Sequence, residues 1–146
     1  MTAVRSNRSI PPSQVIPELA YRDVAAASDW LCKAFGFSRR LTIADHRVQL
    51  TYGVGAVVVV DDDDVDAEAA RATHSVLVRV DNADAHFERA RAAGAKVTSP
   101  PTTYPFGERQ YSAEDPYGHR WTFSESVADV DPRDWGGSLA SEADAS

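Results

Sequence analysis

Apolar residues recur at helical spacing in two stretches of the chain. The first stretch follows Asp23, which suits a helix N-cap, and stops at Gly36. The second follows Asp81 and stops at Gly94. Because the apolar residues lie three or four positions apart, each stretch can bury one face of an amphipathic helix. We therefore predict two helices of similar length.

Runs with β-strand character surround each predicted helix. Several alternate between apolar and polar residues, as half-buried strands do, whereas residues 57–60 are wholly apolar. The sequence Asp115-Pro116-Tyr117-Gly118 suits a type I turn and predicts a hairpin between the last two strands. The predicted strands are residues 15–21, 38–44, 47–52, 56–60, 74–80, 96–99, 109–114 and 119–125.

The two halves of the chain repeat the same order of elements. From N-cap to glycine both helices span 13 residues (36 − 23 and 94 − 81), and the offset between the halves is 81 − 23 = 58. We predict an α+β fold of two tandem β-α-β-β-β modules, residues 14–62 and 73–126, forming a curved mixed sheet around a cleft. A cleft lined by both modules is the expected ligand site.

Charge and cysteine content narrow the function. The chain has 146 residues and a formal net charge of −7, which argues against nucleic acid or an anionic membrane as a partner. Cys32 is the single cysteine, so an intrachain disulfide is excluded. No run reaches the ~20 apolar residues of a membrane helix, and the N-terminus does not resemble a signal peptide. We expect a cytoplasmic protein.

Both ends of the chain are predicted to be tails. Residues 1–13 are polar, contain two adjacent prolines and are expected to be flexible. Residues 127–146 form an acidic C-terminal tail, in which Trp135 is expected to hold the tail against the body or a neighbouring subunit. The acidic run 61–71 lacks the glycine of a calcium-binding loop and is expected to be a solvated linker.

Few polar residues are candidates for chemistry. His74 stands at the start of a predicted strand, and residues 104–111 combine aromatic rings with charged and amide side chains. Alternation along the last strand places Trp121 and Phe123 on one face, expected to be core, and Thr122 on the other. The chain has no glycine-rich phosphate loop and no nucleophile motif.

Two stretches of sequence, within paired modules of this kind, resemble the vicinal oxygen chelate superfamily. They are His74-Ser75-Val76-Leu77-Val78 and Glu114-Asp115-Pro116-Tyr117-Gly118-His119-Arg120-Trp121. This superfamily includes glyoxalase I, extradiol dioxygenases, fosfomycin-modifying enzymes and bleomycin-sequestering proteins. The resemblance covers residues 14–126 and implies the glyoxalase/bleomycin resistance fold, without implying one activity.

The resemblance also implies four metal-ligand positions, on the first and last strands of each module. His74 fills one, and the offset of 58 places Ile16 at its counterpart (74 − 58 = 16). The remaining positions fall at Thr122 and near Val59. Because a catalytic divalent site normally has about three protein ligands, we expect no metal cofactor. The alternative is a divalent metal (Zn, Ni, Mn or Fe) bound by His74 together with Glu18.

The leading hypothesis is a metal-independent homodimer that holds a small organic molecule and thereby sequesters a toxic compound or an antibiotic. One alternative is a metal-dependent lyase, isomerase or dioxygenase, and another is a non-catalytic interaction module. Whether the protein is an enzyme stays open at this point. The residues expected to contact the ligand are His74, Arg109, Gln110, Tyr111 and Thr122.

Overall fold

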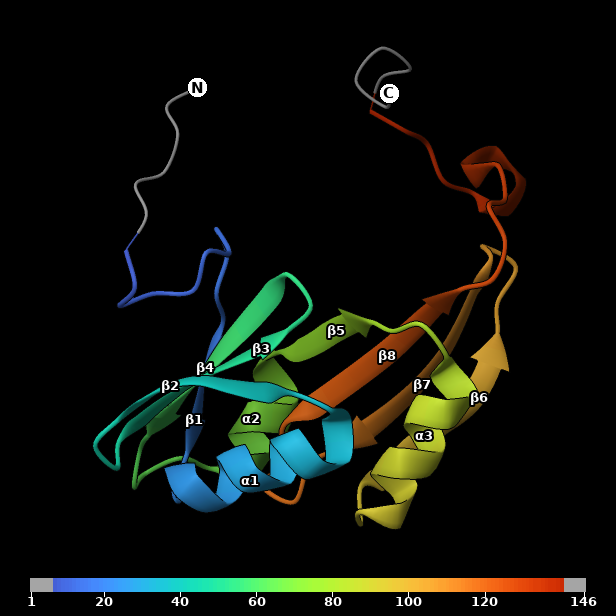
Figure 1. Ribbon diagram of the computed structural model, residues 1–146. Helices are drawn as coiled ribbons and strands as arrows, with labels where there is room; N and C mark the ends of the chain where they lie inside the picture. The colour runs from blue at the N-terminus through green and yellow to red at the C-terminus, as the bar shows by residue number, and fades with distance from the viewer. Residues whose placement is uncertain (1–6, 141–146) are drawn as a thin grey trace.

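The first module of the chain is a four-stranded mixed sheet with one long helix (Figure 1). The computed structural model describes residues 7–140. The elements are β1 (Glu18–Tyr21), α1 (Val24–Phe35), β2 (Ser38–Ile43), β3 (Arg47–Tyr52) and β4 (Gly55–Asp61). Their order in the sheet is β1-β4-β3-β2, in which β1 is parallel to β4 and the other neighbours are antiparallel.

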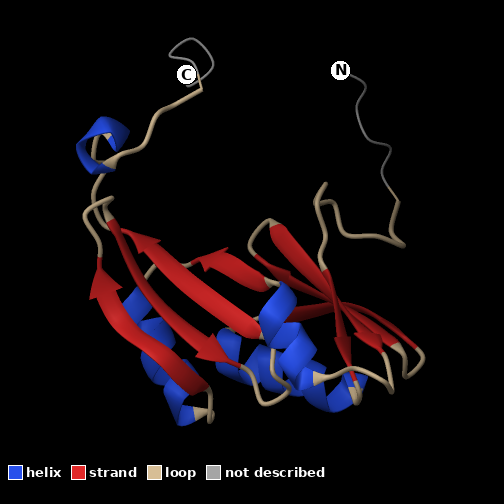
Figure 2. Cartoon of the chain, turned by 180° about the vertical axis from the view of Figure 1, so that it is seen from behind, coloured by secondary structure: helices blue, strands red, loops and turns tan. Residues whose placement is uncertain are grey.

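The second module repeats this plan, and a 3-10 helix, η1 (Pro132–Trp135), follows it. A short helix, α2 (Ala67–Thr73), joins the modules. The elements of the second module are β5 (Ser75–Arg79), α3 (Ala83–Ala92), β6 (Lys96–Thr103), β7 (Glu108–Glu114) and β8 (Arg120–Ser126). The sheet order is β5-β8-β7-β6, with β5 parallel to β8. The predicted α+β class and the two β-α-β-β-β modules are confirmed, and the view from behind shows the strands as two separate sheets (Figure 2).

The helix N-caps lie at slightly different positions in the two modules. Asp23 caps α1 by accepting a hydrogen bond from the Ala26 backbone N–H at 3.0 Å. In α3 the cap is Asn82, which accepts from Ala85 N–H at 3.0 Å, so the prediction of Asp81 was wrong by one residue. Asparagine serves as well as aspartate here because either side-chain oxygen can accept from the first helical turn.

This difference changes the register of the repeat. The N-caps are 82 − 23 = 59 residues apart, so the counterpart of Ile16 is Ser75 (16 + 59 = 75) rather than His74. The offset of 58 holds for the glycines after the helices only, because the second helix is one residue shorter between its cap and its glycine. His74 instead follows helix α2 as its C-cap and precedes β5.

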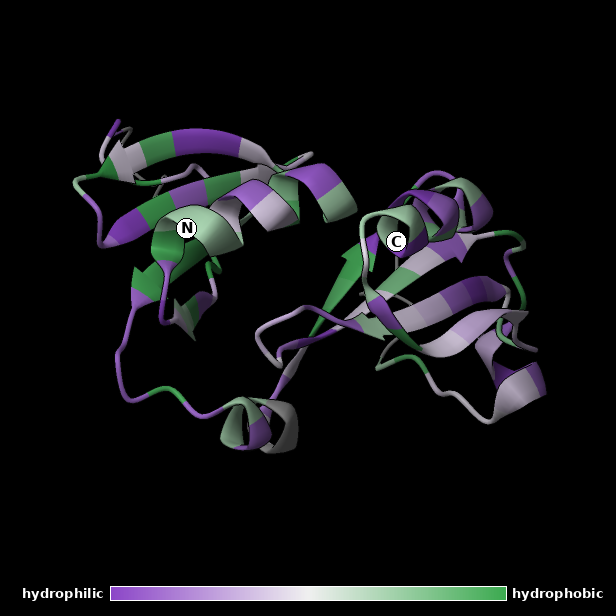
Figure 3. Ribbon diagram, turned by 90° about the horizontal axis from the view of Figure 1, so that it is seen from below, coloured by the Kyte–Doolittle hydropathy of each residue, from purple (hydrophilic) through white to green (hydrophobic). Residues whose placement is uncertain are grey.

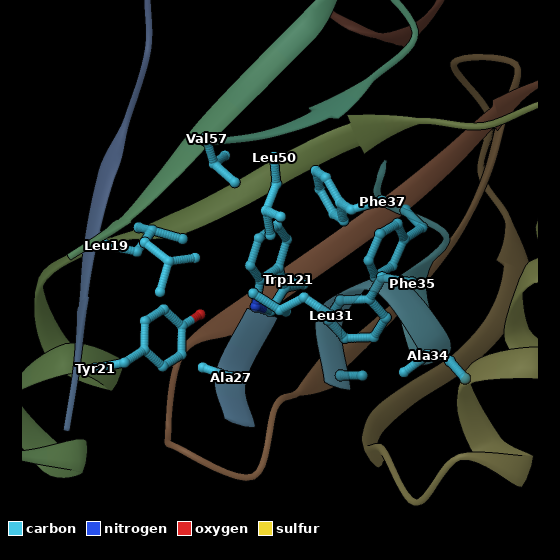
Figure 4. Packing of buried hydrophobic residues seen from close by; sticks show 14 of the residues in the cluster. Leu19, Tyr21, Ala27, Leu31, Ala34, Phe35, Phe37, Leu50, Val57 and Trp121 are labelled. Carbon is cyan, nitrogen blue, oxygen red and sulfur yellow. The ribbon is translucent and has the colours of Figure 1, made fainter. Parts of the chain in front are cut away.

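A single apolar core joins the two modules. Helices α1 and α3 contact each other, and the core contains residues from α1, from α3 and from both sheets. Figure 4 shows Leu31, Phe35 and Phe37 of the first module around Trp121 of the second. Trp121 and Phe123 are fully buried, which confirms the predicted inward face of β8. Burying each of these large side chains contributes about 1.5–3 kcal/mol to stability.

The opposite faces of the sheets carry more polar residues. Figure 3 shows hydrophilic and hydrophobic residues alternating along several strands, as the period of two requires. On β8 the inward Trp121 and Phe123 alternate with Thr122, whose side chain is partly exposed. Within residues 7–140, no helix combines the length and the apolar character needed to cross a membrane.

The buried carboxylate of Asp115 connects the two modules at the β7–β8 turn. Its Oδ1 accepts from the backbone N–H groups of Tyr117 and His119, both at 3.0 Å. Its Oδ2 accepts from the Tyr21 hydroxyl at 2.7 Å and from the Trp121 indole N–H at 3.2 Å. Tyr21 belongs to β1, and in Figure 4 its hydroxyl oxygen points toward the indole nitrogen of Trp121. The aspartate therefore shapes its own turn and also holds the first module to the second.

Helix α2 covers this turn. Gly118 has φ +94°, and a Cβ atom built there would lie 2.5 Å from the Cβ of Ala67, so only glycine fits under the helix. Residues 67–71 are expected from the sequence to belong to a solvated linker, and they are helical instead. Asp66 caps this helix by accepting from the Glu68 N–H at 2.9 Å. Part of the acidic run thus begins a helix, because carboxylates favour helix N-termini.

Replacing Asp115 by asparagine is expected to lower the free energy of unfolding by about 2–3 kcal/mol. If the amide NH2 takes the place of Oδ1, the N–H groups of Tyr117 and His119 both lose their acceptor. If it takes the place of Oδ2, the Trp121 N–H loses its acceptor, whereas the Tyr21 hydroxyl can turn and accept. Urea denaturation measures the change, with Asp45→Asn in an exposed loop as the matched control. Tyr21→Phe removes only the donor from the first module and is expected to cost about 1 kcal/mol. An Asp115→Asn variant as stable as the control would contradict this role.

A second buried polar group, His86, also joins the modules. Its Nε2–H donates to the carbonyl of Phe35 at 2.8 Å, and its Nδ1 accepts from the hydroxyl of Tyr111. Burial lowers the pKa of His86, which keeps the ring neutral in the folded protein.

Because the pKa of His86 is lowered on folding, the unfolded chain binds more protons as the pH falls below the ordinary histidine pKa of about 6.5. Folded-state stability should therefore decrease from about pH 7 to about pH 5. We expect the slope of unfolding free energy against pH to be shallower in His86→Gln than in the wild type. The exposed His46→Gln variant should keep the wild-type slope, and equal slopes in all three proteins would contradict the assignment.

Candidate functional site

A groove lies between the two modules. Its volume is about 1010 Å³. It runs between β5 and the β3–β4 hairpin, so that residues of both modules line it, as expected for the cleft. The lining residues used below are Val15, Phe37, Tyr52, Val54, Leu77, Arg79 and Asp81.

Apolar side chains form most of this groove. Phe37 is buried and meets Tyr52 edge to face, with ring centroids 5.5 Å apart. Three aliphatic side chains along the groove are unusually open to solvent: Val15 is 83% exposed, Val54 96% and Leu77 64%. Apolar side chains gathered at a concave surface mark a site for an apolar ligand or a partner.

A few polar groups complete the groove. Arg79 and Asp81 lie at the end of β5, and the guanidinium of Arg79 donates to Ser126 Oγ at 3.1 Å. Burial raises the pKa of Tyr52, and the nearby Asp81 carboxylate raises it further. The Tyr52 hydroxyl therefore stays protonated at neutral pH and is able to donate a hydrogen bond. The groove combines two aromatic rings with a small set of orienting polar groups.

The residues predicted from the sequence lie elsewhere. Gln110 and Thr122 occupy the face of the second sheet that points away from the helices. Gln110 Nε2 donates to Ser124 Oγ at 3.1 Å, and Ser124 in turn donates to Glu108 at 2.6 Å. The hydroxyl groups of Thr122 and Ser112 share a hydrogen bond of 2.8 Å. This open face is a row of hydroxyl and amide groups that already satisfy one another.

Arg109 and Tyr111 belong to the opposite face of the same sheet. The guanidinium of Arg109 binds the carboxylate of Asp84 at the start of α3, with Nη2–Oδ1 at 2.9 Å. Tyr111 is fully buried, and its hydroxyl bonds to His86. Strand alternation thus separates these two residues from Gln110 and Thr122, and none of the four lines the groove.

His74 is part of a hydrogen-bonded chain that links the modules. A carbonyl can only accept, so His119 Nε2 carries a proton and donates to Ala20 O at 2.7 Å. The other ring nitrogen of His119 then accepts from His74 Nε2–H, at 3.2 Å. Partial burial and the neighbouring His119 lower the pKa of His74. In this arrangement the ring of His74 supports β1 through His119, and His74 does not line the groove.

The donor groups at the positions suggested for a metal do not fit a divalent ion. Glu18 forms an ion pair with Arg47, Thr122 bonds to Ser112, and Val59 is buried in the core. Among the residues that the structure describes, no group of three or more His, Cys, Asp or Glu side chains is arranged to hold a metal. We derive no metal-dependent step for this chain.

The open face of the first sheet is covered by residues 8–11. Gln49 Nε2 donates to the carbonyl of Ser9 at 2.8 Å, Arg40 donates to the carbonyl of Arg8 at 3.2 Å, and Pro11 is buried. A pocket of about 270 Å³ remains beneath this segment. The described part of the predicted N-terminal tail therefore packs on the first module, while residues 1–6 lie outside the described residues.

Sequence reasoning missed the groove residues, although two of them carried a signal. Val54 stands between Gly53 and Gly55 at a hairpin turn, where a polar residue is the usual choice. Leu77 occupies the polar face of an alternating strand, opposite Thr122. Both are apolar residues where the pattern requires exposure. Phe37 gave no signal of this kind, because its sequence position is typical of a buried core residue.

The fold and groove define a class: small duplicated α+β proteins with a ligand-sized cavity between modules. A sequence profile of the Glyoxalase/Bleomycin resistance protein/Dioxygenase superfamily matches residues 14–123. The chain therefore belongs to this superfamily. An uncharacterized protein of Mycobacterium tuberculosis strain H37Rv is 26% identical over 141 aligned residues, which cover 88% of this chain and 83% of the relative.

Solved structures show the same fold. TioX from Micromonospora sp. ML1 is 35% identical, with a TM-score of 0.63, over 79% of this chain and 99% of that one. The bleomycin-binding protein of bleomycin-producing Streptomyces verticillus was solved with copper(II)-bleomycin. It is 21% identical, with a TM-score of 0.60, over 76% of this chain and 93% of its own. At that identity the likeness concerns the fold alone.

Proposed function

We propose that this protein binds a small, largely apolar organic molecule in the groove between its modules, without a metal, and so sequesters it. The observation that carries the proposal is the groove itself, with its aromatic pair Phe37 and Tyr52 and its exposed aliphatic residues. Leaving Val54 and Leu77 in water costs free energy that a ligand would recover by covering them.

The chemistry of the groove supports binding rather than catalysis. Its polar groups are few, and its two charged lining residues, Arg79 and Asp81, are exposed. Relatives of the same superfamily include a protein that binds bleomycin, which supports sequestration of an antibiotic as the role. A planar ring stacked near Tyr52, with a polar substituent reaching Arg79 or Asp81, fits this lining best.

A thermal-shift screen of planar aromatic antibiotics and small oxoacids tests the proposal. A ligand at 100 times its dissociation constant adds about 2.7 kcal/mol of stability, which is readily detected. The shift should persist with a chelator present and should largely disappear in Leu77→Asp, which places a charge in the apolar wall. The exposed Leu139→Asp is the matched control and should keep the shift. A chelator that abolishes the shift, or an undiminished shift in Leu77→Asp, would overturn the proposal.

We propose in addition that the protein is a homodimer that covers the open face of the first sheet. Two apolar side chains there remain open to solvent away from the groove: Ile10 is 51% exposed and Ile43 is 38% exposed. They border the pocket beneath residues 8–11 and form one apolar patch with Ile16. A second copy of the chain would remove this patch from water.

Sedimentation equilibrium measures the association directly. The wild type is expected to sediment as a dimer, and Ile43→Asp as a monomer, because a buried charge opposes association. Val54→Asp places the same charge at an exposed residue of the groove, outside this patch, and should leave the dimer intact. A wild type that stays monomeric at high concentration would contradict the proposed assembly while leaving ligand binding to be judged by the thermal screen.

A further inference from the structure

The segment after β8 folds back onto the loop between β6 and β7. The backbone N–H groups of Val127 and Ala128 both donate to the carbonyl of Gly107, at 2.8 Å and 3.2 Å. Gly107 has φ +87°, and a Cβ atom there would lie 2.0 Å from the carbonyl oxygen of Ala128. Only glycine permits this contact. The beginning of the predicted tail therefore packs against the domain in a defined conformation.

Aromatic rings line the space between this segment and the sheet. Trp135, at the end of η1, meets Phe106 with ring centroids 5.7 Å apart, and Phe106 stacks on Tyr104 at 5.4 Å. The sequence expectation that Trp135 holds the tail against the body agrees with this contact. Trp135 nevertheless stays 42% exposed. Part of its surface is therefore available to a ligand.

A pocket of about 490 Å³ opens beside these rings. Its described lining contains two carboxylates, Glu108 and Asp129, and no lysine, arginine or histidine. It shares no lining residue with the groove between the modules. The pocket is thus a second, separate site, and an inference about it does not depend on the proposed function of the groove.

Glu108 is held as an anion. Hydrogen bonds from the hydroxyl groups of Ser124 and Ser126 lower its pKa, and the positive charge of Arg79 on β5 lowers it further. Arg79 itself donates to Ser126 rather than forming an ion pair with Glu108 in the structure. The carboxylate therefore keeps its charge at neutral pH while it lines the pocket with Phe106 and Trp135.

We propose that this pocket binds an organic cation, a protonated amine or a quaternary ammonium group on an apolar body. The positive nitrogen lies near the Glu108 carboxylate, and the apolar body lies against Phe106 and Trp135. A cation gains both from the carboxylate and from the negative faces of aromatic rings, whereas an anion is repelled by the former. A neutral molecule of the same shape keeps only the apolar contacts.

The probe is 2-phenylethylamine, compared with the neutral 2-phenylethanol and the anionic 3-phenylpropionate. Two-dimensional NMR of the indole N–H signals reports the site, since the chain has three tryptophans. The signal of Trp135 should move on titration, while those of Trp30 and Trp121 stay in place because each donates to a partner elsewhere, Ala93 O and Asp115. The amine is expected to bind about tenfold more tightly than the alcohol.

Glu108→Gln tests the charge without removing the hydrogen-bonding oxygen. In this variant the affinity for the amine should fall to that for the alcohol, while the affinity for the alcohol stays unchanged. The exposed Glu68→Gln is the matched control and should keep the wild-type ratio of the two affinities. Trp135→Ala should weaken both ligands, and the dispersed spectrum of each variant shows that it is folded. Equal affinities for amine and alcohol in the wild type, an unmoved Trp135 signal, or an unchanged ratio in Glu108→Gln would overturn the proposal.

Discussion

The carboxylate of Asp115 is the interaction on which the arrangement of the two modules depends. It is buried and accepts four hydrogen bonds, two from its own turn and two from aromatic side chains. One of those side chains, Tyr21, comes from the first strand of the chain. A buried carboxylate is tolerated only with such complete satisfaction. Because donors from both modules must reach this carboxylate, it fixes the relative position of the two sheets and hence the groove between them.

The duplicated modules share their connectivity but differ in what they expose. The open face of the first sheet is covered by residues 8–11, whereas that of the second carries a row of hydroxyl and amide groups. The groove touches the open face of the second sheet only at β5, through Leu77 and Arg79. It runs along the edge of β5, where the two modules meet, and draws on residues that neither module could bring together alone. The proposed ligand site is therefore a property of the pair of modules.

Much of the fold could be predicted from local pattern. The helical stripes, the alternation of β8 and the Asp-Pro-x-Gly turn depend on neighbouring residues, and all three are observed. The residues that line the groove could not be predicted in this way. Arg109 and Gln110 are adjacent in sequence but lie on opposite faces, and the partner of Arg109 is Asp84, which only the packing of α3 brings near. A set of polar residues chosen from one stretch of sequence therefore combines residues from both faces of the second sheet.

The same limit applies to His74. A repeat offset taken from the helices paired it with Ile16, but one residue fewer in the second helix shifted the strand register. A shift of one residue turns every side chain of a strand to the other face. The contact of His74 with His119 links positions 45 residues apart and depends on the folded turn. Such pairings are set by tertiary structure, so residue spacing alone does not determine them.

A crystal structure of the protein with a compound that raises its melting temperature would show whether the groove between the modules is the ligand site. We expect density for the compound between Tyr52 and β5, in contact with Leu77, with no metal bridging it to the protein. Density on the open face of the second sheet beside Gln110 and Thr122, or at a metal bound by His74, with the groove empty, would contradict it.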